Sequence, residues 1–208
     1  MLSPLYAITD TKLAGFSHPE IVYQLLQGGC RLIQIRDKQL SDAQFLPQLM
    51  ECVNLCHRAG AIILVNDRPD MAALAQTDGV HLGQEDTSPG SARQALGPAR
   101  LIGRSAYNLE QALEAEQDPN VDYIALGPVF ATLTKIINQC PVGLAGVKEV
   151  RSRVKKPLVS IGGINLDNAV EVIMAGADSV AVISDLMGSP PSIAGRTEAF
   201  LARLRSLK

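Results

Sequence analysis

Tryptophan is absent from this sequence, and aromatic residues make up only 4% of the chain. Proteins that bind single-stranded nucleic acids stack bases on aromatic side chains, and this composition offers few such platforms. Runs of lysine or arginine are also missing and the net charge is −2, which argues against nucleic acid or an anionic membrane as the main partner. No apolar stretch approaches the roughly 20 residues of a membrane helix, and the first residues lack a secretory pattern. We therefore expect a cytoplasmic enzyme or binding protein.

The four cysteines, Cys30, Cys52, Cys56 and Cys140, do not form a metal-binding pattern. Cys52 and Cys56 lie four residues apart on one face of a predicted helix, but a zinc site needs two more soft ligands nearby in the chain, and none is present. We expect reduced thiols that mostly fill the core.

Catalytic histidine motifs are missing as well. The sequence has neither an H-E-x-x-H motif nor a Ser–His–Asp order, so zinc hydrolysis and nucleophilic catalysis are poorly supported. His18 and His57 fall in helical stretches and are expected to face solvent. His81 lies within a predicted strand, where a core role and a catalytic role are equally open.

A short apolar run, a polar turn and a helical stretch alternate along the chain. The predicted strands are Leu5–Thr9, Leu32–Arg36, Ala61–Asn66, Gly79–Leu82, Leu101–Ser105, Tyr123–Leu126, Leu158–Ile161 and Ser179–Ile183. Helical patterns lie between and after them, among them His18–Gly28, Asp42–Ala59, Leu109–Glu116, Leu166–Ala175 and Ser192–Leu207. Strands that are apolar throughout are typical of a parallel sheet covered on both faces. Eight of them predict an α/β fold, a single (β/α)8 TIM barrel that takes residues 1–208 as one domain.

An open doubly wound sheet is the structural alternative. It is disfavoured because no G-x-G-x-x-G follows the first strand and no G-x-x-x-x-G-K-[ST] occurs anywhere. The third and fourth helices must be short, and residues 127–143 are expected to form a long loop. Ser41 or Asp42 is expected to cap the second helix, and Asn165 or Asp167 the seventh.

Polar residues gather where the predicted strands end, which is the side of a TIM barrel that carries the active site. They are Gln34, Arg36, Lys38, Asn66, Asp67, Gln84, Glu85, Asp86, Ser105, Thr132, Thr134, Lys135, Gly162, Gly163, Ser184 and Asp185. Polar groups at this mouth are needed neither for the fold nor for the core, so their clustering indicates a binding or catalytic site.

The charges at this mouth match a magnesium–diphosphate site. Mg²⁺ is usually held by one or two carboxylates together with phosphate oxygens of a substrate, and Asp67 and Asp86 supply two carboxylates. Arg36, Lys38 and Lys135 would neutralise the remaining phosphate charge. For any one of these residues, a surface ion pair of about 0–1 kcal/mol is an equally good interpretation.

Two glycines, Gly162 and Gly163, end the seventh predicted strand just before a helix. Without side chains they let backbone N–H groups approach an anion, and phosphate sites after strands seven and eight recur in this fold. A tight strand-to-helix turn without a ligand is the alternative.

At these residues the sequence resembles the bacterial thiamine phosphate synthases, and the resemblance spans almost the whole chain. Its specific segments are Gln34-Ile-Arg-Asp-Lys38, Val65-Asn-Asp-Arg68, Asp78-Gly-Val-His-Leu-Gly-Gln-Glu-Asp86, Thr132-Leu-Thr-Lys135 and Ile161-Gly-Gly-Ile164. The resemblance implies a transferase that couples hydroxymethylpyrimidine diphosphate to hydroxyethylthiazole phosphate and releases diphosphate, by a dissociative, Mg²⁺-assisted mechanism.

Roles for individual residues follow from the resemblance by position. It implies that Lys135, Arg36 and Ser105 act in catalysis and that Asp67 and Asp86 hold Mg²⁺. The implied contacts to the pyrimidine diphosphate are Gln34, Arg36, Lys38, Asn66, Ser105 and Lys135. The implied contacts to the thiazole phosphate are Thr132, Thr134, Gly163, Ile183 and Ser184.

The sequence departs from the family pattern around one loop. Leu133 stands where the family often has proline, and residues 136–140 are more apolar than usual; both changes bear on loop closure and on rate. Asp37 replaces the commoner glutamate, which is a mild change.

Two other functions remain as alternatives. The related thiazole tautomerases use a histidine shortly after the fifth strand, where this sequence has Tyr107. A non-catalytic barrel that binds a phosphorylated metabolite would be expected to lack some diphosphate or metal residues, and all are present. The expected partners are small molecules, with no nucleic acid and no membrane, and assembly into a homo-oligomer is left open.

Overall fold

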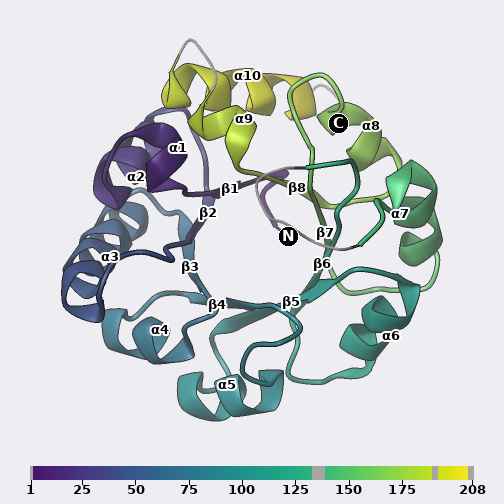
Figure 1. Ribbon diagram of the computed structural model, residues 1–208, viewed down its shortest axis with the longest axis horizontal. Coiled ribbons are helices and arrows are strands. Elements are labelled where there is room, and N and C mark those ends of the chain that lie inside the picture. Colours follow the sequence, from purple (N-terminus) through teal and green to yellow (C-terminus); the bar gives the residue numbers. More distant parts are fainter. Residues whose placement is uncertain (1, 133–138, 189–191, 206–208) are drawn as a thin grey trace.

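The eight strands form a closed parallel barrel in a computed structural model that describes residues 2–132, 139–188 and 192–205 (Figure 1). Each strand pairs with the next along the chain, and β1 closes the ring on β8 through the register of Leu5 with Val180. The strands are β1 (Leu5–Ile8), β2 (Leu32–Ile35), β3 (Ile62–Asn66), β4 (Gly79–Leu82), β5 (Leu101–Ala106), β6 (Tyr123–Leu126), β7 (Leu158–Ile161) and β8 (Ser179–Val182). The (β/α)8 prediction is confirmed, and the open-sheet alternative is wrong.

The helices surround the barrel as an outer ring (Figure 1). They are α1 (Thr11–Ala14), α2 (His18–Gln27), α3 (Asp42–Arg58), α4 (Pro69–Ala75), α5 (Pro89–Leu96), α6 (Leu109–Gln117), α7 (Gly143–Arg151), α8 (Ala169–Met174), α9 (Ser184–Met187) and α10 (Ile193–Arg205). The helices α4 and α5, which follow β3 and β4, have seven and eight residues, as short as predicted. None of the helices in the described ranges is long and apolar enough to cross a membrane.

Local sequence fixes the helix starts. Ser41 caps α3 as predicted, in a capping box in which the Gln44 side chain accepts a hydrogen bond from the Ser41 backbone N–H. The predicted helix from Leu166 starts later, at Ala169. The reason is a preceding turn in which the Asn165 side-chain oxygen accepts the backbone N–H groups of Asp167 and Asn168.

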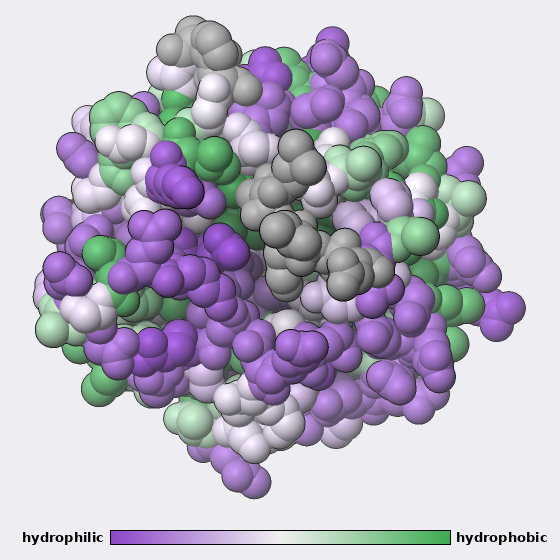
Figure 2. Space-filling model, in the orientation of Figure 1, coloured by the Kyte–Doolittle hydropathy of each residue, from purple (hydrophilic) through white to green (hydrophobic). Residues whose placement is uncertain are grey.

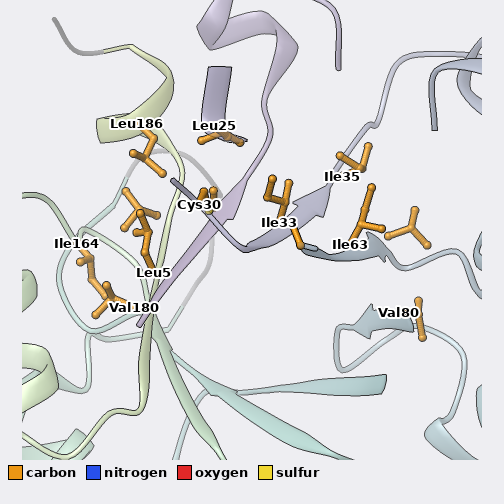
Figure 3. Packing of buried hydrophobic residues seen from close by; sticks show 14 of the residues in the cluster. Leu5, Leu25, Cys30, Ile33, Ile35, Ile63, Val80, Ile164, Val180 and Leu186 are labelled. Carbon is orange, nitrogen blue, oxygen red and sulfur yellow. The ribbon is translucent and has the colours of Figure 1, made fainter. Parts of the chain in front are cut away.

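Buried apolar side chains lie in two layers, outside and inside the barrel. The outer layer joins the strands to the helices, and Figure 3 shows part of it, with Leu5 near Val180 and Ile33 near Ile63. The inner layer includes Tyr6, Ile8, Leu32, Leu64, Tyr123, Ala125, Val159 and Ala181. Successive strand residues point to opposite faces, so each strand feeds both layers.

Three of the four cysteines belong to the outer apolar layer. Cys30, Cys52 and Cys56 are buried, whereas Cys140 is exposed, and all four are free thiols. The prediction that the cysteines are reduced and mostly fill the core is confirmed.

Candidate active site

A pocket opens at the carboxyl ends of the strands, on the face shown in Figure 2, where hydrophilic residues gather around the barrel mouth. Nine of the residues predicted for the site line it: Gln34, Arg36, Asn66, Ser105, Thr132, Gly162, Gly163, Ile183 and Ser184. The predicted residues Lys38, Asp67 and Asp86 lie beside it in a cluster joined to Asn66. Thr134 and Lys135 lie outside the described residues.

Two carboxyl groups meet at the ends of β3 and β4. Asp67 and Asp86 lie within hydrogen-bonding reach of each other, so each carboxyl affects the ionisation of the other. Burial raises the pKa of Asp86, and the hydrogen bond to Asp67 raises it further. Burial also opposes ionisation of Asp67, but hydrogen bonds from Asp86 and Lys38 outweigh it and lower the pKa of Asp67. The two carboxyls therefore titrate as a pair, in which Asp67 ionises more readily than Asp86.

The backbone around this carboxyl pair is tightly determined. Asp67 has a left-handed φ of 61°, which is unfavourable for a residue with a side chain. Its N–H donates to the His81 carbonyl at 2.8 Å, and its carboxylate accepts from Asn66 at 2.6 Å and from Lys38 Nζ at 2.5 Å. The carboxyl of Asp86 accepts the N–H of Gly83 at 2.7 Å. These contacts hold both carboxyls toward one point despite the strained turn.

This arrangement fits a magnesium ion better than a transition metal. Within the described ranges, no group of three or more histidine, cysteine or acidic side chains could hold a metal. A zinc site needs three or four such ligands, whereas Mg²⁺ binds through one or two carboxylates and takes its other ligands from water and phosphate. Asp67 and Asp86 supply two hard oxygen donors of this kind.

The two basic residues of the site within the described ranges, Arg36 and Lys38, stand on a braced loop after β2. The backbone N–H of Arg36 donates to Thr9 Oγ1 at 3.1 Å, and its guanidinium lies 3.9 Å from the Asp10 carboxylate. The Asp37 carboxylate accepts the backbone N–H groups of Gln39 and Leu40 at 2.7 and 2.6 Å. Arg36 therefore reaches the pocket, and Lys38 the carboxyl pair, from a rigid turn.

His18 completes this brace, and its predicted exposure to solvent is wrong, since the residue is 0% exposed. One ring nitrogen lies 3.0 Å from Thr9 Oγ1 and the other 3.1 Å from the Asp37 carboxylate. Burial lowers the pKa of His18, and the Asp37 carboxylate only partly opposes that shift. A histidine at the first turn of α2 is buried because the loops after β1 and β2 fold over it. His57, in contrast, is exposed as predicted.

A chain of buried polar side chains forms the floor of the pocket. Gln34 donates to the Tyr6 hydroxyl at 2.7 Å, the Tyr6 and Tyr123 hydroxyls are 3.0 Å apart, and Tyr123 lies 2.9 Å from His81 Nδ1. His81 Nε2 is 2.9 Å from Ser105 Oγ. Burial raises the pKa of both tyrosines above its ordinary value, which keeps them neutral. Sequence reasoning missed Tyr6 and Tyr123. The feature that could have identified them is a hydroxyl group at a strand position that faces the barrel interior, where the other strands place apolar residues.

The far wall of the pocket depends on two glycines with left-handed φ. A side chain at Gly162 would meet Pro128 at 2.6 Å, and one at Gly163 would meet the Ala131 carbonyl at 2.6 Å. Hydrogen bonds from Val129 and Phe130 hold that segment against the end of β7. The glycines thus allow the chain leading to Thr132 to lie against β7, next to Ile183 and Ser184.

Known proteins resemble this chain over nearly its whole length. The family model described as thiamine monophosphate synthase matches residues 5–186. A thiamine-phosphate synthase of Chloroflexus aurantiacus is 42% identical over 89% of this chain and 85% of its own, and one of Moorella thermoacetica is 43% identical over 89% and 88%. A solved thiamine phosphate pyrophosphorylase from Pyrococcus furiosus is 37% identical and superposes with a TM-score of 0.90, over 98% of this chain and 96% of its own.

Proposed function

This chain belongs to the thiamine monophosphate synthase family of transferases, and from that premise we propose that it couples hydroxymethylpyrimidine diphosphate to hydroxyethylthiazole phosphate. The observation that carries the proposal is a pair of adjacent carboxyl groups beside two cations at one barrel mouth. Asp67 and Asp86 supply the carboxyls, and Arg36 and Lys38 the cations. A diphosphate with Mg²⁺ needs both kinds of group, whereas a neutral substrate needs neither.

The first substrate is proposed to bind over the polar floor of the pocket. Gln34 and Asn66 would hydrogen-bond the pyrimidine end, while Arg36, Lys38 and Ser105 would contact its diphosphate. Mg²⁺ held by Asp67 and Asp86 would neutralise charge on the departing diphosphate. The proposal also assigns Lys135, outside the described residues, to this diphosphate.

The second substrate is proposed to bind on the opposite side of the same pocket. Thr132, Gly163, Ile183 and Ser184 line that side, and Thr134 would join them from outside the described residues. The apolar Ile183 suits a thiazole ring, and the polar groups beside it suit a phosphate.

The reaction we propose is dissociative. The bond between the pyrimidine methylene carbon and the diphosphate oxygen breaks first, and its electron pair leaves with the diphosphate. The aminopyrimidine ring stabilises the resulting cation, which the thiazole nitrogen captures with its lone pair to form the new carbon–nitrogen bond. This route requires no general base, so the protein contributes charge stabilisation and proximity.

The thiazole tautomerase alternative has less support. It would need an acid–base group shortly after β5, where Tyr107 lies half-buried at the pocket wall. The curated relatives cited above carry the synthase name.

The test measures formation of thiamine phosphate by the purified protein from both substrates, with Mg²⁺ or with EDTA. Product is detected by liquid chromatography and mass spectrometry. Product that depends on Mg²⁺ is the expected result. Folded protein that makes no product but exchanges the thiazole tautomers would reverse the choice between the two functions. Folded protein inactive in both assays would favour the non-catalytic alternative.

A further inference from the structure

Five side chains from five strands form one continuous hydrogen-bonded chain across the barrel interior. The order is Gln34 on β2, Tyr6 on β1, Tyr123 on β6, His81 on β4 and Ser105 on β5, and each neighbouring pair lies between 2.7 and 3.0 Å apart. The pocket is lined by Gln34, Tyr6, His81 and Ser105, whereas Tyr123 is buried and is not part of the described lining. Polar groups in an apolar core cost free energy unless they are satisfied, and this chain satisfies them when its hydrogen bonds run in one direction from end to end.

Two proton orders satisfy this chain, because the Tyr6 oxygen accepts the Gln34 amide N–H and can then either donate to Tyr123 or accept from it as well. In the outward order, Tyr6 donates to Tyr123, Tyr123 donates to His81 Nδ1, and His81 Nε2–H donates to Ser105 Oγ. The Ser105 hydroxyl then keeps its proton for a donation toward the pocket. In the inward order, Ser105 donates to His81 instead. A diphosphate only accepts hydrogen bonds, so a contact between Ser105 and the diphosphate selects the outward order.

We propose that this chain is a positioning relay that fixes the Ser105 hydroxyl as a hydrogen-bond donor to the leaving diphosphate. The inference rests on the proposed function, since it takes the diphosphate contact of Ser105 from there. In this relay Tyr6, Tyr123 and His81 act through Ser105 as positioning residues. Tyr123 is the residue to test, because it is buried and is not part of the described pocket lining.

The relay should act on the chemical step more than on binding. Negative charge grows on the diphosphate oxygen as the carbon–oxygen bond breaks, and a donor aimed at developing charge stabilises the transition state beyond the ground state. Removing one oxyanion donor typically lowers kcat about 10²–10³-fold. Loosening that donor without removing it should cost less, so we expect Tyr123→Phe to lower kcat about 10-fold or more. We expect KM for the pyrimidine diphosphate to stay within about threefold of wild type, since ground-state binding is largely kept.

The relay is tested first in a double-mutant cycle. Tyr123→Phe retains the ring and removes the hydroxyl, and Ser105→Ala removes the terminal donor. If Tyr123 acts through Ser105, Tyr123→Phe lowers kcat in the wild type but changes it little in the Ser105→Ala background. Equal losses in both backgrounds would overturn the relay. The matched control is Tyr23→Phe, because Tyr23 is 56% exposed on α2 and is not a member of the hydrogen-bonded chain. This substitution should leave kcat unchanged.

A second measurement does not depend on catalysis at all. The ¹⁵N chemical shifts of the His81 imidazole report which nitrogen carries the proton, and we expect protonation on Nε2 alone in the wild-type protein. A proton on Nδ1 would mean that the chain runs in the opposite direction and would overturn the inference, even if Tyr123→Phe could not be purified folded. Wild-type protein that makes no thiamine phosphate would refute the proposed function, whereas active wild type with an unaffected Tyr123→Phe variant would refute the relay alone.

Discussion

Substituting Gly103 by alanine should disturb the inner layer of the barrel more than any other addition of one methyl group to β5. Gly103 pairs with His81 on one side and with Tyr123 on the other. A Cβ at this position would lie 2.0 Å from Tyr123 Cζ, 2.3 Å from its hydroxyl oxygen and 2.4 Å from Cε1. The absence of a side chain at residue 103 is what lets the Tyr123 phenol cross β5 and reach His81.

The size of the effect follows from how far the ring must move. The phenol has to shift until its 2.0 Å contact reaches an ordinary 3.4 Å or more, which takes its oxygen out of range of at least one partner. Overpacking a core costs about 1–3 kcal/mol, and a buried hydroxyl left without a partner adds about 1–3 kcal/mol. We expect a destabilisation of about 3 kcal/mol, equivalent to a fall in Tm of about 6–12 °C for a chain of this size.

Urea and thermal unfolding, followed by circular dichroism, measure this loss. Gly90→Ala, in helix α5, is the matched control. A Cβ at residue 90 would have its nearest neighbour, on Asn120, at 3.7 Å. Alanine is the better helix former, so this control should be neutral or stabilising by up to about 1 kcal/mol.

A second background separates the clash from other effects of the alanine. Tyr123→Leu lacks the three atoms that a Cβ at residue 103 would meet, so Gly103→Ala should cost little in that background. The reasoning is refuted if Gly103→Ala alone is within about 0.5 kcal/mol of wild type, the range of an ordinary surface substitution, or if it costs the same in both backgrounds.

Three further predictions concern the site and the loops that brace it. Asp86→Asn should fold but lose most coupling activity and need more Mg²⁺ for what remains; an unchanged Mg²⁺ dependence would exclude Asp86 as a ligand. Burial lowers the pKa of His18, so below about pH 6.5 the unfolded chain takes up a proton before the folded protein does. The free energy of unfolding should therefore fall as the pH drops from 6.5 toward 5, by at most about 1.4 kcal/mol per pH unit. Urea midpoints at pH 7.5, 6.5 and 5.5 should therefore fall less steeply for His18→Asn, and parallel curves would contradict this. Gly163→Ala should raise KM for the thiazole phosphate, because its Cβ would meet the Ala131 carbonyl at 2.6 Å; an unaltered KM would show that the 128–131 segment does not shape that subsite.

The barrel could be predicted from local patterns because each strand is buried on both faces. Leu32–Ile35 and Tyr123–Leu126 are buried throughout, and such continuous apolar runs are recognisable without any knowledge of their partners. Strand ends were less accurate, and α8 began three residues later than predicted because an asparagine turn precedes it.

The brace and the floor of the site could not be predicted in the same way, since their polar groups are satisfied by distant residues. His18 looked exposed by its place at a helix start, and only its contacts with Thr9 and Asp37 explain its burial. Tyr6 and Tyr123 lie 117 positions apart in the sequence and meet only when the barrel closes. A single sequence carries no pattern that would pair them.

His81 contacts both parts of the site, the carboxyl pair and the hydrogen-bonded chain on the pocket floor. Its backbone carbonyl accepts the N–H of Asp67 at 2.8 Å and so helps to hold the left-handed turn of the carboxyl pair. Its side chain joins Tyr123 to Ser105. Because a substitution of His81 changes the packing beside that turn and the polar chain together, its effect on rate would not distinguish them. Among the described residues, the Tyr123 hydroxyl hydrogen-bonds only to members of the polar chain, so its removal separates the relay from the carboxyl pair.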